Sequence, residues 1–383
     1  MLYLVILILI LYTVYKFDVC KQKQYRYSWF YFLLIIFIIM AGFSYRLGYD
    51  NANYMREFSE YQLERGYGWQ ELTNHIGRQP FWVLMTKMCK SIIDSYSFFR
   101  FSHALLINTL FFLAFRRLTK HLFSAILFYF VLTYFEFNFQ IMRQSVAIAL
   151  FLISISKYER NQWLSYYIIN SIGFLFHEAA LITFLVPIVK YIGISIFSIM
   201  IYFSMSILGA VVGPLIVEVL LPNIVDSAIA DKAFFYMSRI DDKDSIIGFN
   251  IVLNVFIPFA FIHWKTRTNR NNVVDYFVII YGVLYGLGLS VPLIYRFNQF
   301  FQLCFLICYI EIFNELAIWA KTKLRLNARI VFMSMCLFFL GYRARMYFLP
   351  FGDTNVPSYV QFYPYHSILF EKKNPTREVL LAM

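Results

Sequence analysis

The chain has 383 residues, of which 60% are hydrophobic and only 15% are charged. A soluble protein of this size needs a much more polar surface, so we predict an integral membrane protein. The formal net charge is +12, but Lys and Arg are dispersed between apolar segments and form no basic domain, which argues against nucleic-acid binding.

The chain opens with the apolar run MLYLVILILILYTVYK. No basic residue precedes this run and no small-residue cleavage site follows it, so we expect the first transmembrane helix rather than a cleaved signal peptide. Farther along, Cys304 and Cys308 lie one helical turn apart in an apolar segment. Packing explains this pair better than metal binding.

Apolar runs of about 20 residues, the length that a helix needs to cross the hydrocarbon core, recur along the chain. We therefore predict an all-α, polytopic membrane protein with about 12 transmembrane helices, which form a single domain over residues 1–383. The runs cover residues 1–15, 29–45, 98–115, 122–139, 142–156, 162–176, 178–192, 194–220, 246–264, 273–294, 297–319 and 329–342.

The short segments between alternate runs are rich in Lys and Arg. If the N-terminus faces out, these segments lie on the inner side and hold half of the chain's 34 basic residues. The outer segments are much longer in total, so their density of basic residues is lower, as the positive-inside rule requires. The inner basic residues are Lys16, Lys21, Lys23, Arg26, Arg116, Arg117, Lys120, Lys157, Arg160, Lys190, Lys265, Arg267, Arg270, Lys321, Lys323, Arg325 and Arg329.

Three longer segments, at about 46–97, 221–245 and 343–383, fall on the outer side in this topology. The first mixes aromatic residues with both signs of charge, so we expect short helices at the membrane surface, with a partly ordered loop as the alternative. Small residues mark two later runs: Gly282 with Gly286, and Gly209 with the pair Gly213 and Pro214. Close helix packing explains them better than a functional hinge.

Four unusual polar residues are predicted at the outer interface: Arg46, Arg143, His177 and Arg296. An arginine near a helix end can simply snorkel to the headgroups, which is the alternative explanation for each arginine taken alone. The positive-inside bias, however, disfavours arginines immediately next to outer helix ends. Their occurrence as a group therefore indicates a polar ligand.

Amide side chains accompany these arginines. Gln144 follows Arg143, and Gln299 lies three residues after Arg296, on the same helical face. Ala147, four residues after Arg143, leaves room beside the long cationic side chain. Guanidinium groups offer several planar hydrogen bonds to phosphate oxygens, so the pattern suits a lipid phosphate or diphosphate.

His177 lies in the segment FLFHEAALITF. A zinc-protease helix would need a second histidine at position 181, which is Leu181, so we reject that motif. Neighbouring arginines would favour a neutral imidazole, which makes His177 a candidate general base. A merely structural histidine at a hairpin is the alternative, and Glu178 is either a further site residue or an ion-pair partner of an arginine.

The segment DDKD at 241–244 has the acidic spacing by which many nucleotide-sugar enzymes hold a metal. In a predicted outer loop, where nucleotide sugars are absent, a solvated run of charges is the better explanation.

Five segments together resemble the EpsG-like branch of the Wzy polysaccharide polymerases. They are YRLGYDNANYMREF (with Arg46, Asp50 and Tyr54), ERGYGW (with Glu64, Gly66 and Tyr67), RQSVAIALFL (with Arg143 and Gln144), FHEAALI (with His177) and LIYRFNQ (with Arg296). Each is short, but their order, spacing and shared membrane side make the combination more specific. The family pattern has a small or hydroxyl residue two positions after the histidine, and Ala179 satisfies it.

The resemblance implies a GT-C-like membrane glycosyltransferase in the bacterial inner membrane. Its substrates would be undecaprenyl-diphosphate-linked oligosaccharides, polymerised at the outer face, with a chain-length regulator as a candidate protein partner. We expect Arg143 and Arg296 to stabilise the diphosphate and His177 to activate the acceptor, with His366 as the second-choice base. No cofactor or metal is needed. Arg46, Asp50, Tyr54, Gln144, Glu178 and Gln299 are the expected substrate-binding residues.

Outer aromatics, among them Tyr54, Tyr61, Tyr67 and Trp69, could stack on sugar rings or anchor the chain at the interface. Two other activities would use similar residues. A transporter of the same lipid-linked oligosaccharide would place its cations along a route open to both sides. A ligase would pass finished glycan to a different acceptor.

Overall fold

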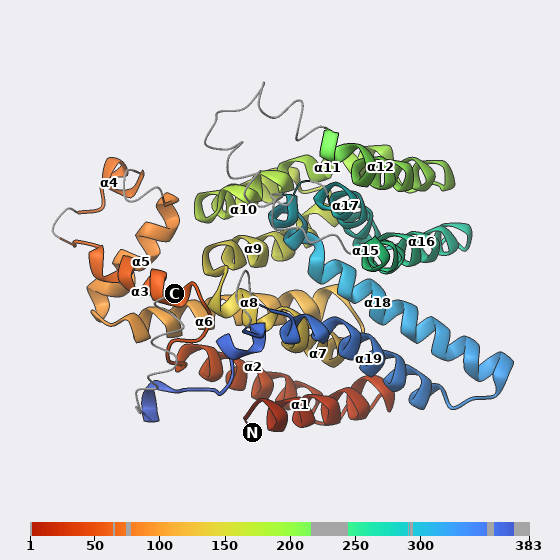
Figure 1. Ribbon diagram of the computed structural model, residues 1–383, viewed down its shortest axis with the longest axis horizontal. Coiled ribbons are helices and arrows are strands. Elements are labelled where there is room, and N and C mark those ends of the chain that lie inside the picture. Colours follow the sequence, from red (N-terminus) through yellow and green to blue (C-terminus); the bar gives the residue numbers. More distant parts are fainter. Residues whose placement is uncertain are drawn as a thin grey trace. The chain divides into compact units, whose positions relative to one another are not determined.

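The structure is a computed structural model that describes residues 2–63, 66–73, 78–215, 244–289, 291, 294–350 and 356–370. Its contacts divide the chain into two compact units (Figure 1). Unit 1 comprises Met1–Ala180 and Phe313–Met383, and unit 2 comprises Leu181–Ile312. The expectation of one polytopic domain stays a prediction.

Every regular element of unit 1 within the described residues is a helix. Its helices are α1 (Leu2–Thr13), η1 (Val14–Val19), α2 (Arg26–Gly42), α3 (Asn51–Glu60), α4 (Trp69–Thr73), α5 (Pro80–Ile92), α6 (Tyr96–Leu118), α7 (Leu122–Leu132), α8 (Tyr134–Phe139), α9 (Met142–Glu159), α10 (Trp163–Phe176), α19 (Ala328–Ala344), η6 (Arg345–Phe348), η7 (Ser358–Gln361) and η8 (Ile368–Phe370). The short helix η2 (Glu178–Leu181) and the long helix α18 (Tyr295–Leu324) pass between the two units.

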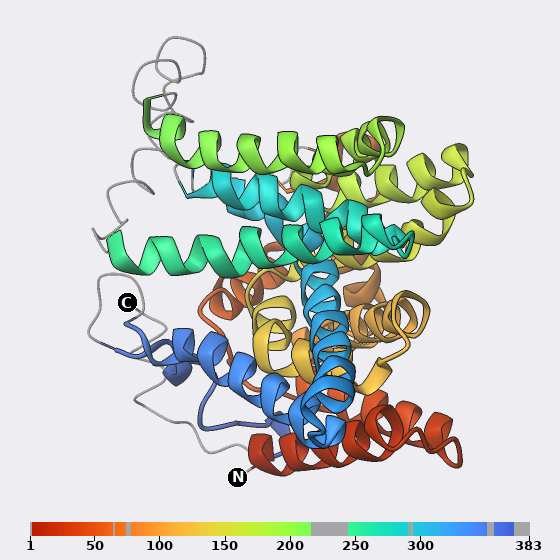
Figure 2. The same cartoon turned by 90° about the vertical axis from the view of Figure 1, so that its right-hand side faces the viewer.

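Unit 2 contains α11 (Ile182–Ile192), α12 (Ile196–Leu215), α15 (Asp244–Ile251), η4 (Val252–Phe256), α16 (Ile257–Arg267) and α17 (Val273–Gly288). Helices α12, α16 and α17 pack side by side (Figure 2). A Cβ atom on Gly286 would lie 2.1 Å from the carbonyl oxygen of Ser206, and the Ser206 hydroxyl donates to the carbonyl of Gly282 at 2.8 Å. Close helix packing, the expected reason for this glycine pair, is confirmed.

Each of the twelve predicted apolar runs contains helix. Within the described residues, five helices are long and apolar enough to cross a membrane. This is the pattern of a helical membrane protein, while twelve crossings stay a prediction. The five spans are Leu2–Val19, Tyr96–Leu118, Gly248–Arg267, Tyr295–Leu324 and Ala328–Phe348.

The predicted run at 122–139 is not one helix. It breaks at Thr133, so that α7 has only 11 residues. At 1.5 Å per residue α7 is about 17 Å long, well short of the hydrocarbon core. Ten of its residues are buried, and the Phe128 ring stacks on Phe339 at 5.7 Å. Helix α7 is therefore apolar because it lies in the core of unit 1.

The outer segment at 46–97 carries three short helices, α3, α4 and α5, as expected. Helices α3 and α5 are amphipathic and bury the large side chains Tyr54, Phe58 and Trp82 in one cluster. In the other outer segments, residues 221–243, 351–355 and 371–383 lie outside the described residues, as do Glu64 and most of the acidic run at 241–244.

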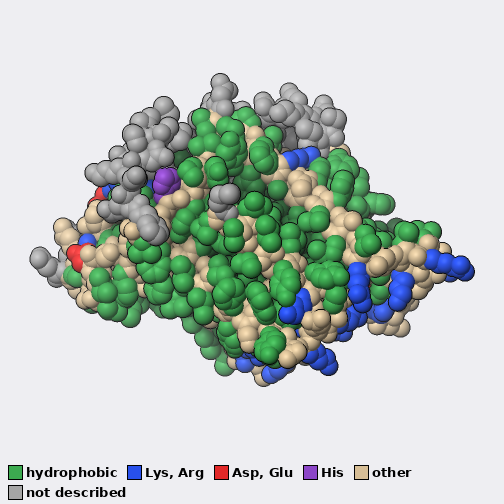
Figure 3. Space-filling model, turned by 90° about the horizontal axis from the view of Figure 1, so that it is seen from below, with side chains coloured by type: hydrophobic (Ala, Val, Ile, Leu, Met, Phe, Trp, Pro, Cys, Tyr) green, Lys and Arg blue, Asp and Glu red, His purple; other side chains and the backbone are tan. Residues whose placement is uncertain are grey.

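Three of the predicted inner segments meet at one end of unit 1. The Arg26 guanidinium donates to the carbonyl of Lys120 at 3.0 Å, and Arg116 lies over the ring of Tyr27 at 5.7 Å. His121 stacks on Phe332, near the start of α19, at 5.7 Å. Figure 3 shows a largely hydrophobic face on which Lys and Arg side chains gather toward one side. This clustering is what a shared inner side would produce.

Candidate functional site

The loop at 43–50, which carries Arg46 and Asp50, is fastened by the segment at 356–370, here called the C-terminal strap. The Tyr45 N–H donates to the carbonyl of His366 at 2.8 Å, and the Gly48 N–H donates to the carbonyl of Gln361 at 3.1 Å. An isolated antiparallel bridge joins Ser44 to Ser367. Two segments at opposite ends of the sequence thus form one corner of unit 1.

Gly48 allows this loop to approach α8. Its φ is +82°, in the left-handed region that favours glycine, and a Cβ atom there would lie 2.8 Å from the Cβ and carbonyl oxygen of Phe139. Arg46 is also left-handed, with φ +44°, and its guanidinium lies over the Tyr45 ring at 5.3 Å. The loop at 43–50 therefore places Arg46 and Asp50, both half-buried, next to the loop that precedes α9.

Arg143 lies in the first turn of α9. Its Nη1 donates to the Oε1 of Gln79 at 2.8 Å, and its charge acts on the Tyr54 side chain of α3. Its Nε is buried and has no partner among the described residues. Arg143 therefore points into the protein toward α3 and the start of α5.

Gln79 continues this network. Its Nε2 donates to the Oε2 of Glu178 at 3.3 Å, so Glu178 reaches Arg143 only through the glutamine amide. The structure thus brings three expected site residues together, Arg143, Tyr54 and Glu178. Asp50 joins them, since it lies close enough for its charge to act on Tyr54.

Two further charged residues adjoin this cluster. Arg78, next to Gln79, forms an ion pair with Glu57 of α3. Burial alone would lower the pKa of Arg78, but its hydrogen bond to Glu57 and the charge of that carboxylate raise it overall. Burial also raises the pKa of Tyr54, although the charge of Arg143 opposes this, so the phenol stays protonated at physiological pH.

His177 ends α10 and is buried, with 5% of its surface exposed. The N–H of Ala179 donates to its Nδ1 at 3.1 Å. A neutral imidazole whose Nδ1 accepts a hydrogen bond carries its proton on Nε2. This contact therefore favours the tautomer of His177 that carries its proton on Nε2.

A buried histidine, His103, fixes the start of α9. The Nε2 of the buried His103 lies 2.9 Å from the carbonyl oxygen of Met142, the residue before Arg143. Gln144 is buried in the same turn. Ala147 lies against Gly173 of α10, at 3.6 to 3.8 Å from the position of a Cβ there, so it serves helix packing.

Arg296 and Gln299 belong to unit 2, in the first turns of α18. Arg296 is exposed and Gln299 is buried. The expectation that Arg296 shares a cavity with Arg143 and His177 stays a prediction, because these residues lie in different units.

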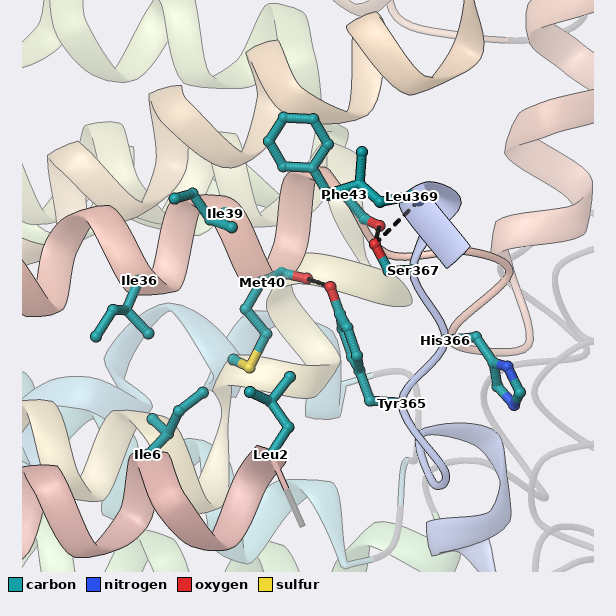
Figure 4. Close-up of a pocket in the computed structure, with 10 residues that line it drawn as sticks. All are labelled: Leu2, Ile6, Ile36, Ile39, Met40, Phe43, Tyr365, His366, Ser367 and Leu369. Atoms are coloured by element: carbon teal, nitrogen blue, oxygen red, sulfur yellow. Dashed lines mark hydrogen bonds between the residues drawn. The ribbon is translucent and has the colours of Figure 1, made fainter. Parts of the chain in front are cut away.

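A cavity of about 480 Å³ lies beside the C-terminal strap, between α1 and α2 (Figure 4). Its lining is mainly apolar, and Tyr365 closes it by donating from its hydroxyl to the carbonyl of Met40 at 3.1 Å. In Figure 4 the ring of His366 points away from Leu2 and Ile6. A role for His366 as a base stays a prediction.

The outer aromatics divide into two groups. Tyr54 and Tyr61 are buried in hydrophobic clusters, so their rings have no open face for a sugar. Tyr67 and Trp69 are exposed and keep that role as an expectation.

Sequence reasoning missed Glu57, Arg78 and Gln79. The signal that could have found them is the tripeptide Arg78-Gln79-Pro80 in front of an amphipathic segment, since proline favours the first turn of a helix and the residues before it then lie at a helix entrance.

Comparison with known proteins gives one family. The sequence model of the EpsG family matches residues 27–367, which include every expected site residue. No curated protein and no solved structure matches the chain. The resemblance inferred from the five motifs is thereby confirmed, and the chain belongs to the EpsG family.

Proposed function

We propose that the protein is a Wzy-type membrane glycosyltransferase, which polymerises undecaprenyl-diphosphate-linked repeat units at the outer face of the bacterial inner membrane. Membership of the EpsG family supports a polysaccharide polymerase of the membrane. One observation supports a location for the active site. Arg143 lies in a half-buried polar cluster with Gln79 and Glu178, and its Nε has no partner among the described residues.

The reaction transfers the growing glycan from its lipid diphosphate to a sugar hydroxyl of the next repeat unit. The bond between the anomeric carbon and the diphosphate oxygen breaks, and the bond to the acceptor oxygen forms. Diphosphate is a good leaving group that needs charge stabilisation, which Arg143 supplies, with Arg296 as its expected partner. This scheme requires no metal.

The acceptor hydroxyl must be oriented and lose a proton. The contact from Ala179 to the Nδ1 of His177 supports a role for His177 as a donor, which holds a substrate oxygen through its Nε2–H. Glu178, the neighbouring carboxylate, is then the candidate base. Arg46, Asp50 and Gln144 form the glycan-facing surroundings, with the buried Tyr54 near Arg143 and with Gln299 beside Arg296, in a GT-C-like arrangement of about 12 crossings.

Reconstitution in liposomes with a defined undecaprenyl-diphosphate-linked repeat unit tests the proposal. The wild-type protein should lengthen the glycan, and Arg143→Ala, His177→Ala and Arg296→Ala should each reduce lengthening by about 100-fold or more. Full activity in all three variants would disprove the assignment of the site. Movement of the lipid between leaflets without lengthening would identify a transporter, and transfer only to a different acceptor would identify a ligase.

A further inference from the structure

The two arginines of the polar cluster differ in their partners. Arg78 is neutralised by a direct ion pair with Glu57, whose side chain is 10% exposed. Arg143 has no ion pair within 4 Å among the described residues, although its charge acts on both Tyr54 and Tyr61. A half-buried cation without a counterion costs free energy, so such a site favours an incoming anion.

A carboxylate stands close by, yet it does not reach Arg143. Glu178 is separated from the guanidinium by the amide of Gln79, whose oxygen accepts from Arg143 at 2.8 Å and whose nitrogen donates to Glu178 at 3.3 Å. An amide side chain offers its oxygen as an acceptor to a cation and its nitrogen as a donor to an anion at the same time. Gln79 thus satisfies both charges while it keeps them apart.

The backbone of Gln79 is fixed. It is the residue before α5, in extended conformation, and its carbonyl accepts from the N–H groups of Trp82 and Val83 at 3.1 and 3.3 Å. Trp82 and Val83 are fully buried, so the entrance of α5 is anchored in the core. The side chain of Gln79 makes no capping hydrogen bond to its own helix. Its amide bonds to Arg143 and Glu178 instead.

We propose that Gln79 is a positioning residue that prevents Glu178 from pairing with Arg143, so that the guanidinium stays available to the phosphate of the substrate. The inference rests on the proposed function for the identity of the anion. A phosphate oxygen takes the place of the Gln79 oxygen at Nη1. The amide of Gln79 then remains with Glu178, which stays away from the phosphate.

Binding of farnesyl diphosphate, a short polyprenyl diphosphate, to the detergent-solubilised full chain measures this directly. Gln79→Ala should weaken binding by about tenfold or more, because Glu178 can then approach Arg143. The double variant Gln79→Ala with Glu178→Gln should bind within about threefold of Glu178→Gln alone, because the competing carboxylate is gone. Wild-type affinity in Gln79→Ala, or equal losses in the single and double variants, would overturn the proposal.

Gln79→Glu provides a variant of the same size. Its own carboxylate pairs with Arg143, so it should also weaken binding, and Glu178→Gln should not restore it. Gln140→Ala is the matched control, because this amide at the same end of unit 1 donates to the Oε1 of Gln361 at 2.7 Å and contacts no charge. Any loss that it causes should likewise not respond to Glu178→Gln. Rescue of either variant by Glu178→Gln would contradict the proposed mechanism.

The result is independent of the polymerase assay. If farnesyl diphosphate binds the wild type no better than Arg143→Ala, the guanidinium is no anion site and the inference fails. If binding follows the pattern above but no glycan is lengthened, the proposed polymerase activity fails while the role of Gln79 stands.

Discussion

At the scale of single residues, the surroundings of Arg78 and Arg143 separate a structural charge from a functional one. Arg78 forms an ion pair with Glu57, which raises the pKa of the guanidinium. This ion pair stabilises the contact between α3 and the entrance of α5. Arg143 contacts the neutral groups of Gln79 and Tyr54 instead. The same side chain therefore fastens two elements in one case and leaves a charge for a ligand in the other.

Breaking the first of these arrangements should cost stability. Glu57→Gln removes the partner of Arg78 and should lower the free energy of unfolding by about 1–3 kcal/mol. Because the pKa of Arg78 is raised, its stabilising contribution is fully present below the ordinary arginine pKa and is lost only as the pH rises through the higher folded value. The loss in melting temperature, followed in detergent, should therefore be the same at neutral and mildly alkaline pH.

Asp94→Asn is the control for this variant. Asp94 also pairs with a cation, Lys90 at 3.9 Å, but its side chain is 70% exposed, so its loss should change stability by less than about 1 kcal/mol. Equal effects of the two substitutions would contradict the distinction between a buried and an exposed pair.

The tautomer of His177 makes a second prediction. A glutamine amide can place a donor near the position of the imidazole Nε2, so His177→Gln should retain polymerisation within about tenfold of the wild type, whereas His177→Ala should lose about 100-fold or more. The rate of glycan lengthening in the reconstituted system measures both. If Gln is as inactive as Ala, the imidazole acts as a base and not as a donor.

The sequence selected Arg143, Tyr54 and Glu178 because each lies in a recognisable motif, and the structure brings these three side chains into one polar cluster. It was not sufficient for Gln79 and Arg78, whose importance comes from contacts across 64, 99 and 21 residues of chain. No local spacing encodes such contacts. The tautomer of His177 likewise depends on the backbone turn that brings the N–H of Ala179 to Nδ1.

At the scale of elements, hydropathy located the helices but could not tell lipid from protein as the apolar surroundings. Helix α7 is as apolar as a membrane span because it is buried on all sides. The break at Thr133 has neither Pro nor Gly to announce it, so the run at 122–139 looked continuous. Apolar composition predicts burial, and it does not by itself distinguish a crossing from a core helix.

The glycine contact between α12 and α17 gives a prediction at this scale. Gly286→Ala would place a Cβ 2.1 Å from the Ser206 carbonyl, so the helices must move apart, and the yield of folded protein should fall sharply. Gly341→Ala in α19 is the control, because no atom lies within 4 Å of a Cβ there. It should be neutral or slightly stabilising, since alanine is the better helix former. Monodisperse protein recovered by gel filtration measures both, and a normal yield of Gly286→Ala would show that α12 and α17 pack differently.

At the scale of the whole molecule, the distribution of charge gives an orientation that can be measured. The basic segments around Arg26, Lys120 and Phe332 meet at one end of unit 1. The C-terminal strap contacts the loop that follows the opposite end of α2, and Arg143 lies at the start of α9. We predict that the basic end faces the cytoplasm and that the end with Arg143 faces out.

Cysteine labelling tests this orientation in cells. In a Cys20→Ser background, Tyr67→Cys should react with a membrane-impermeant maleimide in intact cells, whereas Lys323→Cys should react only after permeabilisation. Both positions are exposed, so their reactivity depends on the side of the membrane. The reverse pattern would place the polar cluster at the inner face and contradict an outer-face polymerase.

The C-terminal strap adds a constraint on how the protein is made. The loop with Arg46 is synthesised early, but the hydrogen bonds that fix it come from His366 and Gln361, which follow much later in the chain. The helices of unit 1 can therefore insert in order while the corner that carries Arg46 and Asp50 stays unfinished. We therefore expect a ribosome-bound chain that lacks the strap to insert its preceding helices before the polar corner with Arg46 forms.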